Sequence, residues 1–208
     1  MTQDFYHNFY AVRIKEVRRT MVINPPYYEA IDLFTGREIP KNPVDFRYYM
    51  GGTKLDDCLS SPIGGWLWSD RLVMALNDAG ITGFNLYPVV LKDKQKEDVE
   101  GYSGVSIVGR AGKVDFKKSE VIKEQPEGWP KVIERLKGMY FGLEEWDGSD
   151  IFLAEGSLYV FCTKKFVDAV SKLKGHNFEF TPVSEYRLSK SFLDSQLEKE
   201  AKEKGEVD

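Results

Sequence analysis

The stretch Ser69-Asp-Arg-Leu-Val-Met-Ala-Leu76, followed by Phe84-Asn-Leu-Tyr-Pro-Val89, is matched later in the chain by a second stretch of the same design. The second copy runs Thr163-Lys-Lys-Phe-Val-Asp-Ala-Val170 and then Phe178-Glu-Phe-Thr-Pro-Val183. The two align without a gap, and each holds a hydroxyl residue that can cap a helix, apolar residues at helical spacing, and an alternating strand. We expect these residues to build a scaffold and not a reaction centre.

Apolar segments before both copies complete two pseudo-repeated units of strand, helix and strand, at approximately residues 65–91 and 157–185. Their apolar helix faces are expected to be buried: Leu72, Val73 and Leu76 in the first unit and Phe166, Val167 and Val170 in the second. Elsewhere, short alternating segments are divided by glycine and proline. The sequence therefore predicts an α+β protein with mixed, mostly antiparallel sheets and few short helices.

The 208 residues, 42% of them hydrophobic, suffice for one domain over residues 1–208, with two closely packed lobes as an alternative. Residues 190–208 are rich in Glu and Lys, and we expect a charged tail that frays. Apolar residues at 132, 133, 136 and 139 fit a short helix, although a twisted strand could carry the same pattern.

Charge and composition narrow the class of partner. Lys and Arg (29) are outnumbered by Asp and Glu (33), for a net charge of −4, which disfavours a basic nucleic-acid-binding face. The N-terminus has no apolar leader pattern, and no stretch reaches the roughly 20 apolar residues of a membrane helix. We therefore expect a cytoplasmic protein without a membrane partner. Cys58 and Cys162 fit two buried thiols better than a disulfide framework, although a single bridge stays open.

Motifs that carry catalytic or cofactor chemistry are weak. The two histidines, His7 and His176, have no second ligand at metal-site spacing, and no nucleophile turn of the G-x-S-x-G type occurs. Gly104 and Gly109 have the glycine spacing of a phosphate loop, but the Lys-Ser/Thr pair is replaced by Arg110-Ala111. The sequence predicts no catalytic residue, no cofactor and no metal site, and hence a protein that is not an enzyme.

Acidic residues gather at Glu144, Glu145, Trp146 and Asp147, with Asp150 close behind. Such a cluster could hold a hard cation or supply an acid/base pair, but it matches no calcium loop. An exposed acidic turn beside a tryptophan is the simpler interpretation, and it could contact a basic protein.

A second acidic pair, Asp56-Asp57, lies in the irregular segment before the first unit and has the same two interpretations.

Several motifs resemble one protein family. The repeated units, the run Tyr102-Ser-Gly-Val-Ser-Ile-Val-Gly-Arg110 and the segment Asp150-Ile-Phe152 resemble immunity family eleven, a family of bacterial immunity proteins found beside polymorphic-toxin genes and formerly a domain of unknown function. The resemblance covers roughly residues 65–189, and no match is apparent in the first sixty residues. It implies scaffold roles for Ser69, Gly83, Gly109, Arg110, Asp115 and Phe152. The chain departs from the pattern at Cys162-Thr163 and at Asn177.

The resemblance implies a non-catalytic protein that binds a cognate toxin domain, possibly a basic one, and blocks its active surface. The residues expected to touch the toxin are those of the two acidic groups: Asp56, Asp57, Glu144, Glu145, Trp146 and Asp147. The alternative is a small-ligand-binding protein or enzyme with a carboxylate-lined cleft between the two units.

Overall fold

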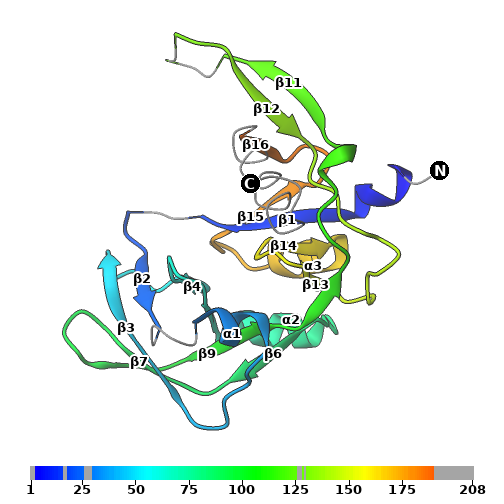
Figure 1. Ribbon diagram of the computed structural model, residues 1–208. Coiled ribbons are helices and arrows are strands. Elements are labelled where there is room, and N and C mark those ends of the chain that lie inside the picture. The colour runs from blue at the N-terminus through cyan, green and yellow to red at the C-terminus, as the bar shows by residue number, and fades with distance from the viewer. Residues whose placement is uncertain (1–2, 16–17, 26–29, 126–127, 129, 190–208) are drawn as a thin grey trace, which may run out of the picture.

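The computed structural model describes residues 3–15, 18–25, 30–125, 128 and 130–189 (Figure 1). Within these residues the chain forms three α-helices and sixteen strands in four sheets. The pairs β10–β13 and β3–β7 are parallel, and the other strand pairs of these sheets are antiparallel. The predicted mixed α+β class with mostly antiparallel sheets and few helices is confirmed. The tail at 190–208 lies outside the described residues.

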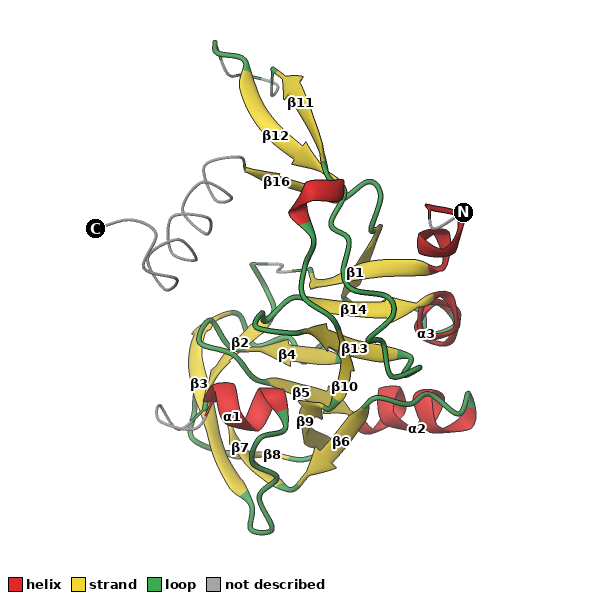
Figure 2. Cartoon of the chain, turned by 45° about the vertical axis from the view of Figure 1, so that its right-hand side comes forward, coloured by secondary structure: helices red, strands yellow, loops and turns green. Residues whose placement is uncertain are grey.

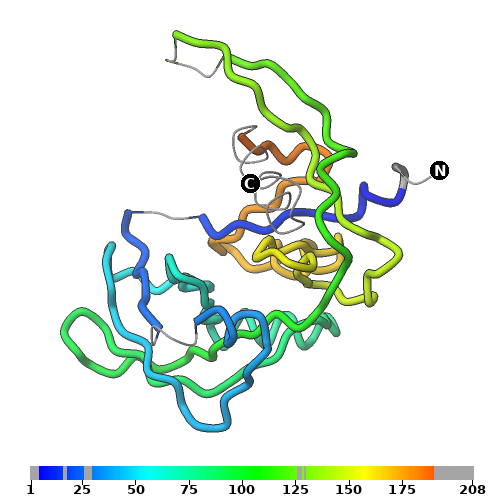
Figure 3. The backbone as a smooth tube through the Cα atoms, in the orientation of Figure 1, coloured from blue at the N-terminus to red at the C-terminus, as the bar shows by residue number. Residues whose placement is uncertain are grey.

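Two of the sheets hold the segments on either side of the longer helices. The five-stranded sheet has the order β10 (Gly109–Ala111), β13 (Ile151–Ala154), β14 (Val160–Thr163), β1 (Phe9–Ile14) and β15 (Phe178–Pro182). A four-stranded sheet has the order β4 (Cys58–Ser60), β5 (Trp66–Ser69), β9 (Tyr102–Ile107) and β6 (Phe84–Tyr87). Figure 3 shows the N-terminal β1 running beside the C-terminal β15, its antiparallel partner.

Two further sheets complete the fold. One has the order β2 (Met21–Asn24), β3 (Val44–Gly51), β7 (Val89–Lys92) and β8 (Asp98–Val99), and the other β11 (Glu120–Glu124), β12 (Ile133–Lys137) and β16 (Arg187–Ser189). The helices are α1 (Ala30–Thr35), α2 (Asp70–Asp78) and α3 (Lys164–Ser171), with 3-10 turns η1 (Gln3–Asn8) and η2 (Phe116–Lys118). The β11–β12 hairpin projects from the body of the protein (Figure 1).

The helix predicted near residue 133 is wrong, and the strand alternative is right. Leu136 of β12 pairs with Val121 on one side and with Leu188 on the other. Leu136 is buried together with Leu188, because the alternating side chains of a strand place them on one face. The apolar spacing near residue 133 fits both a helix and a strand. The pairing of this segment with β11 and β16 makes it a strand.

Helices α2 and α3 lie side by side (Figure 2) and begin at the expected hydroxyl caps. Ser69 Oγ accepts the Leu72 N–H at 3.3 Å, and Thr163 Oγ1 accepts the Phe166 N–H at 3.4 Å, which satisfies an amide at each helix start. The predicted burial is confirmed for the following residues: Leu72, Leu76, Phe166 and Val170. Val73 and Val167 are only half-buried, so the prediction was too strong for both.

The strands around the two helices pair in matching ways. β5 and β6 flank β9 and are antiparallel to it, and β14 and β15 flank β1 in the same manner. The registers also correspond: Ser69 lies opposite Tyr102 and Phe84 opposite Ile107, while Thr163 lies opposite Phe9 and Phe178 opposite Ile14. β4 pairs antiparallel with β5, and β13 with β14; β4 is an edge strand, whereas β13 has β10 on its other side.

Between the two sheets and the helices lies a buried cluster centred on Trp68, Leu72 and Phe166. A second cluster, around Phe141, Phe152 and Phe161, fills the opposite side of the five-stranded sheet. A third cluster, around Phe46, Leu67 and Tyr87, packs the sheet of β2, β3 and β7 against that of β4, β5 and β6.

Candidate functional site

The acidic turn, residues 144–147, connects β12 to β13 and carries two exposed carboxylates, Glu144 and Glu145. Trp146 is half-buried: its indole Nε1 donates to the Ser149 carbonyl at 3.0 Å, and its ring meets Phe9 edge-on at 5.0 Å between centroids. The tryptophan therefore anchors the turn to the core and leaves the glutamates at the surface.

Asp147 fixes the conformation of the same turn. One of its oxygens accepts the Arg110 N–H at 2.8 Å, and the other accepts the Ser149 N–H at 3.0 Å and the Ser149 hydroxyl. Burial raises the pKa of Asp147, but these hydrogen bonds outweigh burial and hold the pKa below its usual value. Asp147 is thus ionised at neutral pH.

Asp57 belongs to the interior, with 3% of its surface exposed. Its carboxylate accepts two hydrogen bonds from the Arg71 guanidinium, each at 2.6 Å, and one from the Ser69 hydroxyl at 2.7 Å. A bidentate pair of this kind compensates the buried charge. Asp57 joins β4 to the start of α2.

Asp56 is equally buried, at 4% exposure. It accepts the Thr20 hydroxyl at 2.5 Å and forms an ion pair with Lys54. The structure therefore separates the six predicted contact residues: Glu144 and Glu145 are open to solvent, whereas Asp56 and Asp57 are enclosed by protein.

Sequence reasoning missed that Asp150, just before β13, is bonded much as Asp57, just before β4, is: each accepts from the hydroxyl that caps a helix and pairs with a cation. Asp150 accepts the Thr163 hydroxyl at 2.9 Å and pairs with Lys165 at 3.0 Å. It also accepts the Thr82 N–H at 3.1 Å. The sequence did contain a signal. In both segments an aspartate, Asp57 or Asp150, is followed by a strand and then by a hydroxyl cap with a cation two residues after it.

Arg71 and Lys165 also connect α2 and α3 through reciprocal hydrogen bonds. Arg71, at the start of α2, donates to the Lys174 carbonyl beyond α3 at 3.2 Å. Lys165, at the start of α3, donates to the Gly80 carbonyl beyond α2 at 2.6 Å. Each helix start is thus bonded to the loop that follows the other helix.

The residues that carry the family resemblance occupy structural positions. Gly83 has φ +100°, and a Cβ there would lie 2.0 Å from the Ile151 carbonyl oxygen, so a larger residue would displace β13. Arg110 donates to the carbonyls of Ile107 and Thr35, which holds β10 against the C-terminal end of α1. Asp115 accepts the Lys117 N–H at 3.1 Å and caps η2, and Phe152 is fully buried.

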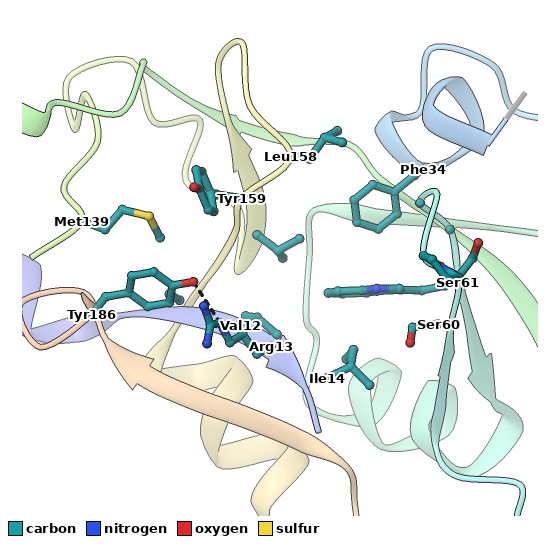
Figure 4. Close-up of a pocket in the computed structure, with 16 residues that line it drawn as sticks. Val12, Arg13, Ile14, Phe34, Ser60, Ser61, Met139, Leu158, Tyr159 and Tyr186 are labelled. Atoms are coloured by element: carbon teal, nitrogen blue, oxygen red, sulfur yellow. Dashed lines mark hydrogen bonds between the residues drawn. The ribbon is translucent and has the colours of Figure 1, made fainter. Parts of the chain in front are cut away.

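A pocket lies between the two units, and we call it the inter-unit pocket (Figure 4). Its volume is about 400 Å³, and β1, β4, α1 and segments 61–66 and 158–160 contribute to its lining. Arg13 is its charged side chain, and no Asp or Glu lines it among the residues described. This pocket is therefore not the expected carboxylate-lined cleft.

Both cysteines, Cys58 and Cys162, are buried free thiols, so the thiol prediction is confirmed over the disulfide alternative. Burial raises the pKa of each thiol well above its usual value, which keeps it protonated and unreactive. In the described part of the chain, no group of three or more His, Cys, Asp or Glu side chains is arranged to hold a metal ion.

The fold defines an α+β protein whose framework aspartates are enclosed and whose acidic turn faces solvent. The model of the immunity protein family Imm11 matches residues 8–185, and the chain therefore belongs to this family. The match also includes most of the first sixty residues, where motifs alone had shown no resemblance. No curated protein matches the chain. None of the helices in the described ranges is long and apolar enough to cross a membrane.

Proposed function

We propose that the protein binds a cognate bacterial toxin domain and neutralises it by covering the toxin's active surface, without catalysis of its own. Membership of the Imm11 immunity family carries this proposal. A neutralising protein needs a rigid base that presents a few anchors, because a preformed surface loses little conformational freedom on binding. The acidic turn, held by Trp146 and Asp147, has these properties.

The contact surface in this proposal centres on Glu144 and Glu145. Both are exposed, while the turn beneath them is fixed by the hydrogen bonds of Asp147 and by the packing of Trp146 against Phe9. Asp56 and Asp57 support binding indirectly, since their enclosed carboxylates hold the frame and are already paired.

The toxin domain is proposed to be basic, and the encounter to take place in the cytoplasm without nucleic acid or membrane as partner. The net charge of −4 and the exposed glutamates favour a cationic partner. Complementary charge accelerates association, and salt screens the attraction, so the on-rate should fall as salt is added.

The two strand-helix-strand units are proposed to be a structural repeat within a single domain, residues 1–208. Support comes from the matching registers around β9 and β1 and from the paired aspartates Asp57 and Asp150. The reciprocal bonds of Arg71 to the Lys174 carbonyl and of Lys165 to the Gly80 carbonyl also support this proposal.

Co-expression tests the proposed function directly. The chain is produced together with the product of the adjacent gene, and growth is measured with each protein alone and with both. The proposal predicts that the neighbouring product is lethal alone and harmless with this chain. A neighbouring product that is harmless alone, or that still kills in the presence of this chain, contradicts the proposal.

A further inference from the structure

We propose that the inter-unit pocket binds a small aromatic carboxylate, a ligand that the proposed toxin contact does not involve. Its volume of about 400 Å³ lies within the roughly 300–1,000 Å³ typical of small-molecule sites. The pocket also combines one cation with aromatic walls, as a flat organic anion requires. The acidic turn at 144–147 contributes no residue to its lining.

Arg13 supplies the positive charge. Its Nε donates to the Tyr186 hydroxyl at 2.9 Å, and its guanidinium carbon lies 4.9 Å from the centre of the Tyr186 ring. Figure 4 shows this pair at one side of the pocket. Glu179 lies opposite Arg13 in the β1–β15 register but forms no ion pair with it. Among the described residues, no hydrogen bond or ion pair engages the two terminal nitrogens of Arg13.

Those two terminal nitrogens specify the ligand's charged end. A guanidinium with a fixed Nε presents parallel donors that match the two oxygens of a carboxylate. Arg13 carries one positive charge, and no Asp or Glu among the described residues lines the pocket. Arg13 can therefore neutralise one negative charge of a ligand but not two. A monocarboxylate therefore fits better than a phosphate dianion.

The opposite wall specifies the ligand's apolar body. Phe34 and Trp66 meet edge-on with centroids 5.2 Å apart, and both are buried residues of the pocket lining. Figure 4 shows Phe34 facing the side on which Tyr159 and Tyr186 lie. Aromatic walls of this kind favour a flat ring. The half-buried hydroxyls of Ser60 and Ser61 can orient the ring's polar substituents.

The test titrates the ¹⁵N-labelled full chain with indole-3-acetate and with benzoate, and compares indole-3-acetate with its neutral analogue indole-3-acetamide. We expect at least one acid to shift the Trp66 indole and Tyr186 amide signals. We also expect the acetamide to bind at least about tenfold more weakly than indole-3-acetate, the factor that about 1.4 kcal/mol represents. Absence of shifts with both acids up to about 10 mM, a concentration that detects even weak fragment binding, overturns the proposal. Equal affinity for acid and amide also overturns it.

Two variants localise the site, with spectral dispersion confirming that each is folded. Arg13→Gln should weaken acid binding at least about tenfold, whereas Lys15→Gln, which removes an exposed charge outside the lining, should not change it. Leu158→Trp enlarges an exposed side chain of the pocket lining and should keep the acids out of the pocket. If Arg13→Gln does not fold, Leu158→Trp tests the assignment in its place. Unchanged binding in folded Arg13→Gln, or in folded Leu158→Trp where Arg13→Gln does not fold, refutes the assignment.

Co-expression of the two pocket variants, Arg13→Gln and Leu158→Trp, with the toxin distinguishes small-molecule binding in the pocket from toxin neutralisation. Both variants should still neutralise the toxin in co-expression, because the acidic turn is intact. Loss of neutralisation without any binding of the acids would assign the pocket to the toxin and overturn the small-molecule proposal.

Discussion

The pair Asp56-Asp57 and the acidic turn at 144–147 are both clusters of acidic residues in the sequence, yet the protein uses them in opposite ways. Asp57 is 3% exposed and receives three hydrogen bonds from Arg71 and Ser69. Glu144 and Glu145 are exposed on a turn that other residues hold in place. Under the proposed function, only the acidic cluster whose charges are left to solvent contacts a partner, because enclosed charges are already neutralised by their own partners.

Removal of the cation beside Asp57 should have the largest effect on stability. Arg71→Met leaves a buried carboxylate without its bidentate partner, and we expect a loss of about 3 kcal/mol in the free energy of unfolding. Urea denaturation measures it. The matched control Lys92→Met removes an exposed pair with Asp98 and should cost less than about 1 kcal/mol. Equal losses in the two variants would show that Asp57 is not a framework charge.

The second unit should respond in the same direction but less strongly. Lys165→Met leaves Asp150 with the Thr163 hydroxyl and the Thr82 N–H, so the expected loss is about 2 kcal/mol. The same urea series compares it with Arg71→Met. A loss larger than that of Arg71→Met would reverse the order that the hydrogen bonds predict.

Asp147 should give the smallest effect, and it depends on pH. The pKa of Asp147 is lowered in the folded protein, so the stabilisation is present above the unfolded pKa of about 3.9 and disappears as pH falls through the folded value. At pH 7 Asp147→Asn should cost about 1 kcal/mol or less, because solvent screens this exposed residue. Thermal unfolding at pH 7 and at progressively lower pH should show the difference from wild type shrinking. A difference that does not change with pH would contradict the assigned role.

Local features of the fold could be predicted from the sequence. The caps Ser69 and Thr163 and the buried positions Leu72 and Phe166 follow from the spacing within one helix. Half-burial of Val73 could not be predicted in this way, because it depends on how closely α2 approaches its neighbours. A charge at Val73 should therefore cost less than one at Leu72.

Features that depend on distant partners were not predictable. The strand β12 is decided by its pairing with β11 and β16, and the enclosure of Asp57 by Arg71 and Ser69 depends on how β4 meets α2. The acidic turn was located because its charges are contiguous in sequence. The sequence did not predict that the inter-unit pocket is lined by a cation and aromatic side chains, because Arg13, Phe34 and Trp66 come from separate segments.

Under the proposed function, Glu144 and Glu145 contact the toxin while the buried aspartates Asp56 and Asp57 only hold the frame. The direct measurement is the dissociation constant for the toxin domain encoded by the adjacent gene, compared between wild type and the double variant Glu144→Gln/Glu145→Gln at low and high salt. The double variant should bind at least about tenfold more weakly than wild type at low salt, with a smaller difference in affinity at high salt and unchanged unfolding in urea. Wild-type affinity in the folded double variant at both salt concentrations would contradict it.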